Sequence, residues 1–179
     1  MTTATEKYYA EECLLDGRAL VIRAVHADDK PLLKEAMRHL SPQSIYFRFF
    51  TPKTELTEEE LAFFTEVDFI HHVALMASVK HDDELVPAGV GRYIIAKNAP
   101  PSSNAELAFV VSEEYQGLGI ATLLLKHLTK IARSRNVEAF TALVLPTNTK
   151  MLSVFRHCEL PMETTTDSAG GLEILLKLR

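Results

Sequence analysis

The segment that most constrains the fold is Ala105–Leu125, where an apolar strand pattern runs through a glycine-containing turn into an amphipathic helix. The spacing predicts a strand over Ala105–Val111 and a helix over Ile120–Ser134. Between them, Gly117 and Gly119 let the backbone turn sharply and let a bulky anion approach the amides. The first turn of the helix adds unpaired N–H groups and the positive end of the helix dipole. The segment therefore predicts a phosphate or pyrophosphate site.

Three other structures could contain a glycine-rich turn of this kind. A P-loop is excluded because the chain contains no Gly-Lys pair. A Rossmann fingerprint would need a glycine where Thr122 stands and an acidic residue ending the next predicted strand, Ala139–Leu145, which instead ends in apolar residues. A plain strand–turn–helix with glycines for geometry stays open on these residues alone.

The rest of the chain alternates strand and helix patterns. Further strands are predicted over Ala19–Ala24, Val73–Val79 and Val86–Ala96, with a final hairpin around residues 168–171. Helices are predicted after Asp28, after the Ser41-Pro42 cap, over Glu58–Val67 after a Thr57 capping box, and over Thr149–His157. Residues 98–104 are predicted to form a loop. A run of strands followed by one βαβ crossover predicts an α/β or α+β fold with one mixed central sheet flanked by helices.

Composition narrows the function. The chain has 179 residues, 47% of them hydrophobic, as expected of one globular domain rather than a disordered segment. A net charge of −5 argues against a nucleic-acid partner. No apolar run approaches the roughly 18–20 residues that span a bilayer, and the N-terminus lacks a signal-peptide pattern. Cys13 and Cys158 form no CxxC pair, and no residues show metal-ligand spacing. We therefore expect a cytoplasmic protein without membrane or metal.

Several motifs carry a resemblance to a known family. The run Gln116-Gly117-Leu118-Gly119-Ile120-Ala121 resembles the Q/R-x-x-G-x-G/A signature of the GNAT acetyltransferase superfamily. Within that superfamily, the chain is most similar to the GNAT module of bacterial protein lysine acetyltransferases, through residues 41–50 (SPQSIYFRFF) and the later Pro146, Asn148 and Phe155. The resemblance covers nearly the whole chain. It implies a single GNAT domain over 1–179, with 1–13 as a loose N-terminal extension. It also implies a mixed, mostly antiparallel sheet with a V-shaped splay between two central parallel strands.

The resemblance also implies a substrate and its contacts. Acetyl-CoA would lie in the splay, with Asn148 near the thioester end. The strand residues along the pantetheine arm would be Phe109, Val110 and Val111. The pyrophosphate would be held around Gln116, Gly117, Leu118, Gly119, Ile120, Ala121 and Thr122. The acceptor would be a primary amine, and the subgroup that the chain resembles implies a protein lysine. The acetyl group would pass directly to it in a ternary complex. The enzyme would be a monomer or a homodimer.

Two other functions stay open. One is acetylation of a small-molecule amine. The other is a non-catalytic acyl-CoA sensor, since many GNAT members use a tyrosine after the later helix to protonate the leaving thiolate. No tyrosine follows Tyr115 in this chain, so water or Cys158 would have to supply that proton.

Glu106 is the predicted catalytic base. A lysine ammonium is protonated at neutral pH and must lose a proton before it can attack a thioester. A carboxylate inside an apolar strand is costly unless it is used or paired, and the resemblance places a catalytic glutamate in this strand. The structural alternative is a strand-edge glutamate facing water. His71, His72 and His127 are predicted to be structural, and the aromatic cluster around Tyr46 to be core.

Overall fold

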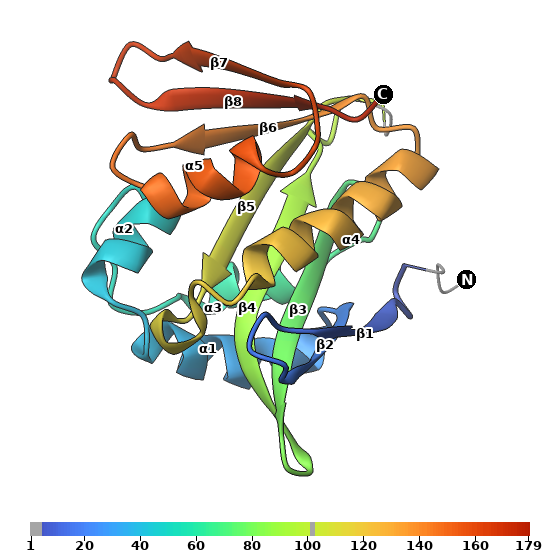
Figure 1. Cartoon of the computed structure of the whole chain (residues 1–179), viewed down its shortest axis with the longest axis vertical. Helices are drawn as coiled ribbons and strands as arrows, with labels where there is room; N and C mark the ends of the chain where they lie inside the picture. Colours follow the sequence, from blue (N-terminus) through green and yellow to red (C-terminus); the bar gives the residue numbers. More distant parts are fainter. Residues whose placement is uncertain (1–4, 101–102) are drawn as a thin grey trace.

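The computed structural model describes residues 5–100 and 103–179. Within them, one sheet of eight strands has the order β1-β2-β3-β4-β5-β6-β8-β7 (Figure 1). Its strands are β1 (Tyr9–Cys13), β2 (Ala19–Ala24), β3 (His72–His81), β4 (Glu84–Ile94), β5 (Ala105–Val111), β6 (Ala139–Val144), β7 (Met162–Thr166) and β8 (Leu172–Lys177). The helices are η1 (Ala27–Asp29), α1 (Lys30–Arg38), α2 (Pro42–Phe49), α3 (Glu58–Thr65), η2 (Glu113–Tyr115), α4 (Ile120–Ser134) and α5 (Thr149–Arg156).

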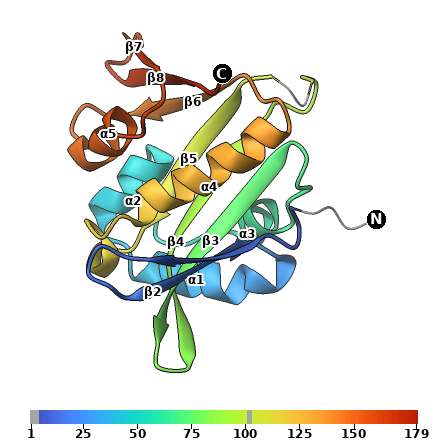
Figure 2. The same cartoon turned by 45° about the vertical axis from the view of Figure 1, so that its right-hand side comes forward.

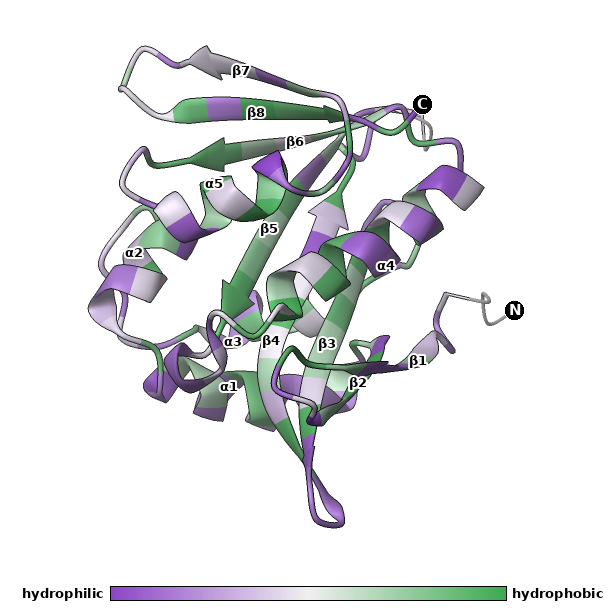
Figure 3. Cartoon of the chain, in the orientation of Figure 1, coloured by the Kyte–Doolittle hydropathy of each residue, from purple (hydrophilic) through white to green (hydrophobic). Residues whose placement is uncertain are grey.

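Two hydrophobic clusters cover the two faces of this sheet. On one face, α4 and α5 pack through residues such as Leu124 and Phe155 against the odd-numbered side chains of β5. On the other face, α1, α2 and α3 form a smaller cluster with Ala74 and Met76 of β3. In Figure 3 the apolar colour follows the central strands, while the tip of the β3–β4 hairpin is hydrophilic. The predicted mixed sheet flanked by helices is confirmed.

The central strands β5 and β6 form the only parallel pair of the described sheet, and they part almost at once. Their register holds for two residue pairs, Ala105↔Phe140 and Glu106↔Thr141. From Leu107 onward β5 pairs with β4 alone. Figures 1 and 2 both show the two strands diverging toward α2 and α5. The predicted V-shaped splay is therefore present, with its apex at Glu106.

Local signals fixed the ends of most helices. Ser41 accepts a hydrogen bond from the Ser44 amide at the start of α2, and Thr57 forms the expected capping box with Glu60. The predicted bounds of α4 agree with the structure. The predicted loop over residues 98–104 is present where it is described, although Pro101 and Ser102 lie outside the described residues.

The expectation of a loose extension over residues 1–13 is wrong for its second half. Tyr9–Cys13 is strand β1, which pairs antiparallel with β2. The strand was missed because its alternating residues are only partly buried, so its hydrophobic period is weak. The Tyr8 hydroxyl is also hydrogen-bonded to His127 Nδ1 at 2.6 Å, which holds this segment against α4. Residues 1–4 lie outside the described part of the chain.

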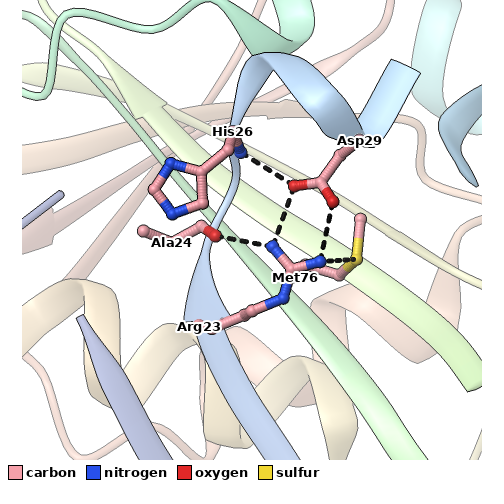
Figure 4. Close-up of polar contacts among 5 residues, drawn as sticks. All are labelled: Arg23, Ala24, His26, Asp29 and Met76. Atoms are coloured by element: carbon pink, nitrogen blue, oxygen red, sulfur yellow. Dashed lines mark hydrogen bonds and ion pairs between the residues drawn. The ribbon is translucent and has the colours of Figure 1, made fainter. Parts of the chain in front are cut away.

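An ion pair on the α1 side ties the start of that helix to the sheet (Figure 4). Both guanidinium nitrogens of Arg23 donate to Asp29, at 2.8 and 2.7 Å, and the His26 amide donates to the same carboxylate at 2.8 Å. Burial would raise the pKa of Asp29, but the hydrogen bonds from Arg23 and His26 outweigh it and leave the pKa lowered. A partly buried arginine in this protein is thus matched by a buried, bidentate carboxylate.

Candidate active site

A cavity of about 680 Å³, here called the groove, opens where β5 leaves β6. Its walls come from the second half of β5, the loop that leads into α4, the start of α5, and α2. Because β5 has lost its parallel partner there, no strand pairs with its backbone on that side, and only the Val111 carbonyl among the hydrogen bonds described is taken, by Gln116. The remaining backbone groups can bind an extended ligand. The groove therefore has the shape and the unpaired backbone that a long, amide-containing substrate arm requires.

The N-terminus of α4 forms one end of the groove. Gly119 is the N-cap residue, with φ of 92°, and Gly117 has φ of 79°. No side chain caps this helix and its first turn holds no acidic residue, whereas side chains cap α2, α3 and α5. The first N–H groups of a 15-residue helix thus face a cavity with their dipole uncompensated. This end of the groove suits a phosphate group.

Gln116 fastens the loop before α4 to three neighbouring elements. Its amide nitrogen donates to the Val111 carbonyl at 3.0 Å and to Ser44 Oγ at 3.3 Å. Its amide oxygen accepts from Lys150 Nζ at 2.7 Å. With its polar atoms engaged in this way, Gln116 positions the loop. Lys150, which the sequence analysis did not single out, brings a positive charge to the same cavity.

The structure brings together most of the predicted contact residues. Those that line the groove are Phe109, Val110, Val111, Gln116, Gly117, Gly119, Ile120, Ala121, Thr122 and Asn148. Leu118 is not among them, and its carbonyl accepts from the Leu15 amide at 3.2 Å. Asn148 borders the groove while its side-chain oxygen caps α5 through the Met151 amide.

Glu106 lies outside the groove wall, at the apex of the splay, with its side chain exposed. It stands opposite Ile94 of β4, and Ala108 stands opposite Arg92. Directly opposed residues of antiparallel strands share a face, so Glu106 points to the same side of the sheet as Arg92. That side is covered by α1, α2 and α3.

A second, smaller cavity lies on that side, between α1, α2, α3 and the strands β4 and β5. It measures about 70 Å³ and is here called the pocket. Most of its lining is apolar, including Met37, Phe64 and Met76, but two arginines, Arg48 and Arg92, also border it. Arg48 and Val110 line both cavities, so the groove and the pocket meet at these two residues.

The two arginines are stacked on aromatic rings. The Arg92 guanidinium lies 4.6 Å from the ring centre of Phe64, and that of Arg48 lies 5.0 Å from Phe49 and 5.5 Å from Phe64. Burial and then the like charge of Arg48 lower the pKa of Arg92 to about 9. Burial also lowers the pKa of Arg48, and the charge of Glu106 acts against that lowering. The arrangement concentrates positive charge beneath the splay.

His72 completes this cluster as a neutral side chain. Arg92 Nη1 lies 2.9 Å from His72 Nε2 and also donates to the Phe64 carbonyl at 3.1 Å. Because an arginine can only donate, His72 Nε2 must be the acceptor, which requires the proton on Nδ1. Burial and the charge of Arg92 lower the pKa of His72 to about 3. His72 is thus a structural acceptor.

Arg92 was not predicted as a site residue, although its sequence context carries a signal. Arg92 is a charged residue inside a strand predicted to be buried, which is the same pattern that singled out Glu106. Arg48 was quoted only as part of a motif. Its importance depends on the packing of α2 against β5, which no local pattern reports.

Other residues that drew attention lie away from both cavities. His127 is buried between Tyr8 and Glu12, with Glu12 at 2.8 Å. Tyr46 is 44% exposed and lines neither cavity. Cys158 Sγ donates to the Phe155 carbonyl at 3.0 Å and does not border the groove. Among the described residues, no group of three or more His, Cys, Asp or Glu side chains could hold a metal ion.

Comparison with known proteins decides the family. The sequence pattern of the "Acetyltransferase (GNAT) family" matches residues 35–159, which is most of the chain. The chain belongs to the GNAT acetyltransferase family. Its site is therefore that of an acetyltransferase that uses acetyl-CoA as its co-substrate, and the groove with its open α4 N-terminus fits that molecule.

Individual relatives agree with this assignment. Acetyltransferase PA5475 of Pseudomonas aeruginosa is 31% identical over 130 residues, which cover 73% of this chain and 68% of that protein. The crystal structure of the GNAT domain of S. lividans PAT superposes with a TM-score of 0.83 at 30% identity, covering 94% of this chain and 96% of that one. The yncA acetyltransferase of Salmonella typhimurium, solved with acetyl-CoA, shares the fold with a TM-score of 0.71 at 16% identity, over 89% and 94% of the two chains.

Proposed function

We propose that this GNAT acetyltransferase moves the acetyl group of acetyl-CoA directly onto the side-chain amine of a protein lysine. Donor and acceptor are bound together, and Glu106 removes the proton from the amine. We also propose that the chain is one domain acting in the cytoplasm. In the described part of the chain, no helix is long and apolar enough to cross a membrane. Support for a protein lysine comes from the similarity to bacterial protein lysine acetyltransferases, above all in residues 41–50.

The observation that carries the proposal is the meeting of two cavities at Arg48 and Val110. A donor in the groove and an acceptor entering from the α1–α3 side would approach each other across β5 without either leaving its site. Direct transfer needs both substrates at once, and holding them in contact supplies much of the rate enhancement.

The residues suggest how each step is assisted. The amides at the start of α4 would hold the pyrophosphate, and unpaired backbone groups of β5 would hold the pantetheine arm. Glu106 stands at the apex of the splay, on the acceptor side, with an exposed carboxylate that can accept a proton directly or through water. Free backbone N–H groups of β5 would stabilise the negative charge that develops on the carbonyl oxygen.

The test replaces the base. Glu106→Gln keeps the shape and removes the proton acceptor, so kcat for release of the CoA thiol should fall by roughly 10²–10⁴-fold. Acetyl-CoA should still stabilise the variant against thermal unfolding, by about 2.7 kcal/mol near 100 times Kd. Glu84→Gln, at another exposed glutamate near the start of a strand, is the matched control and should behave as wild type. Full activity of Glu106→Gln would remove Glu106 from the mechanism.

A non-catalytic acyl-CoA sensor is the second candidate. It is favoured by one observation, that the single tyrosine on the groove wall, Tyr115, lies in η2 before α4 and not after α5. A sensor would bind acetyl-CoA and release no thiol with any amine. The same assay with wild-type protein, using lysine peptides and small amines as acceptors, separates the sensor from the two enzymatic alternatives.

A further inference from the structure

We propose that the pocket binds a carboxylate carried by the acceptor, close to the amine that is acetylated. This inference rests on the transfer reaction proposed above and adds a rule for choosing the acceptor. The ligand group is an acidic side chain beside the target lysine or the α-carboxylate of a free amino acid. Both present the same planar anion to Arg48 and Arg92.

Neither arginine of the pocket has an anionic partner among the described residues. Arg92 is only 4% exposed, and among the described residues no carboxylate is hydrogen-bonded or ion-paired to Arg92 or Arg48. Arg23, by contrast, is matched by the bidentate carboxylate of Asp29 (Figure 4). Buried charges are normally paired, because removing an unpaired ion from water is expensive. The unmatched arginines point to an anion supplied from outside the chain.

The two arginines also have no carboxylate in direct contact. Among the described residues, the charge of Glu106 acts on Arg48 and that of Asp68 acts on His72. Glu106 is exposed and forms no ion pair with Arg48, and Asp68 accepts hydrogen bonds from the backbone amides of residues 70–72. His72 is neutral, because its Nε2 accepts from Arg92. A carboxylate from outside the chain would supply the direct contact that the described residues do not.

The size and place of the pocket also fit a carboxylate. Its volume of about 70 Å³ is roughly half that of a ~150 Å³ cavity that binds benzene, so it suits the end of a short side chain. The apolar lining would exclude water from an anion bound there, which strengthens its attraction to a guanidinium. Because Arg48 also borders the groove, a group held by Arg48 lies next to the bound donor.

The experiment compares matched acceptors on the wild-type protein. One arm uses lysine peptides with Asp or Glu next to the lysine against the same peptides with Asn or Gln. A second arm uses a free apolar amino acid against its amide. In at least one of the two comparisons, the acceptor that carries the carboxylate should have a kcat/KM roughly 10–100-fold higher than its neutral counterpart, as expected for a charge-assisted contact. Equal values in both arms would overturn the inference while leaving the acetyl transfer intact.

Variants locate the effect. Arg48→Met should bring the acidic-to-neutral ratio of kcat/KM close to one, and using a ratio within one variant cancels any general loss of activity. Arg48→Lys keeps the charge without the bidentate fork and should give an intermediate ratio. Arg38→Met, at an exposed arginine of α1 outside both cavities, is the matched control and should keep the wild-type ratio. An unchanged ratio in Arg48→Met would overturn the assignment to this pocket.

A binding measurement separates this inference from the proposed function. Fluorescence anisotropy of the labelled acidic and neutral peptides, with CoA-loaded protein, needs no turnover. Tighter binding of the acidic peptide that is lost in Arg48→Met would support the pocket even if no thiol were released, in which case only the transfer reaction would fall. Equal binding of the two peptides, together with normal turnover, would support the proposed transfer reaction and overturn the proposed carboxylate site in the pocket.

Discussion

The groove and the pocket meet at Arg48 and Val110, yet they are built from different parts of the chain. The groove offers backbone groups to a ligand: an unpaired strand edge in β5 and the uncapped N–H groups of α4. The pocket is made of side chains, with apolar residues from three helices around two arginines. The groove thus depends on backbone conformation, and the pocket, where we propose that the acceptor binds, depends on residue identity.

This difference has a consequence for specificity. A backbone site accepts many side-chain changes as long as the chain keeps its path, so one donor can be held by divergent sequences. A side-chain site changes with each substitution, so acceptor choice can vary among relatives that share the fold. Substitutions in the groove and around the pocket can test this difference.

The largest effect on the groove is expected from Gly119→Ala. A residue other than glycine at φ of 92° costs about 1–3 kcal/mol, although a Cβ there would find its nearest neighbour, Leu15, at an ordinary 3.5 Å. If the loop relaxes to avoid that strain, acetyl-CoA Kd should rise by roughly 10–100-fold in calorimetric titration.

Gly170→Ala is the matched control for this change. Gly170 has φ of 87° and open space around it, in the β7–β8 hairpin away from the groove. It should lower stability through similar strain and leave the acetyl-CoA Kd at its wild-type value. An unchanged Kd in Gly119→Ala would show that the groove does not depend on this turn.

The pH dependence of stability tests the role of His72, which accepts a hydrogen bond from Arg92 of the pocket. The pKa of His72 is lowered from 6.5 to about 3 in the folded protein, so below pH 6.5 the unfolded chain binds a proton that the folded chain does not. Stability therefore falls as pH falls between 6.5 and 3, by about 1.4 kcal/mol per pH unit. Because half of the unfolded chains are already protonated at pH 6.5, urea unfolding should show a loss of about 1.6 kcal/mol between pH 6.5 and 5 that His72→Gln lacks.

His157→Gln serves as the control for the pH effect, because His157 is exposed at the end of α5. It should show the full wild-type loss of stability on acidification. If His72→Gln loses as much stability as wild type over the same range, His72 is not the neutral acceptor of Arg92.

The smallest effect is expected from Gln116→Ala. The change removes hydrogen bonds to Val111, Ser44 and Lys150, each worth about 0.5–1.5 kcal/mol, from a loop that other contacts also hold. We expect a several-fold rise in acetyl-CoA Kd with kcat retained. Gln43→Ala removes a glutamine from the same groove wall and should change Kd less. An equal rise in Kd for both variants would mean that Gln116 only lines the groove and does not hold the loop in place.

Much of the fold was predictable because its signals are local. The bounds of α4 followed from a 3.6-residue apolar period, and the starts of α2 and α3 from Ser41 and Thr57 caps. Each such signal spans only a few residues. Strand β1 was not predicted, because a half-exposed edge strand has no clear hydrophobic period. Its existence depends on pairing with β2.

The candidate site divides in the same way. The glycine turn and the helix that follows it predicted an anion site, because every group involved lies within one short segment. Arg48 and Arg92 could not be predicted as a pair, because they stand 44 positions apart and meet only where α2 packs beneath β4 and β5. Likewise, nothing near Gln116 in sequence indicates its contact with Lys150.

The amino-acid sequence alone thus indicates where most strands, turns and helices begin, and it predicts an anion site at Gly117–Thr122. Hydrophobic period, glycine conformation and capping are properties of neighbouring residues. The separation of β5 and β6 at Glu106 is visible only in the folded structure, as is the pocket that holds two arginines for which the described residues supply no carboxylate partner. Those features come from contacts between distant residues, and such contacts exist only once the sheet and the helices on both its faces are assembled.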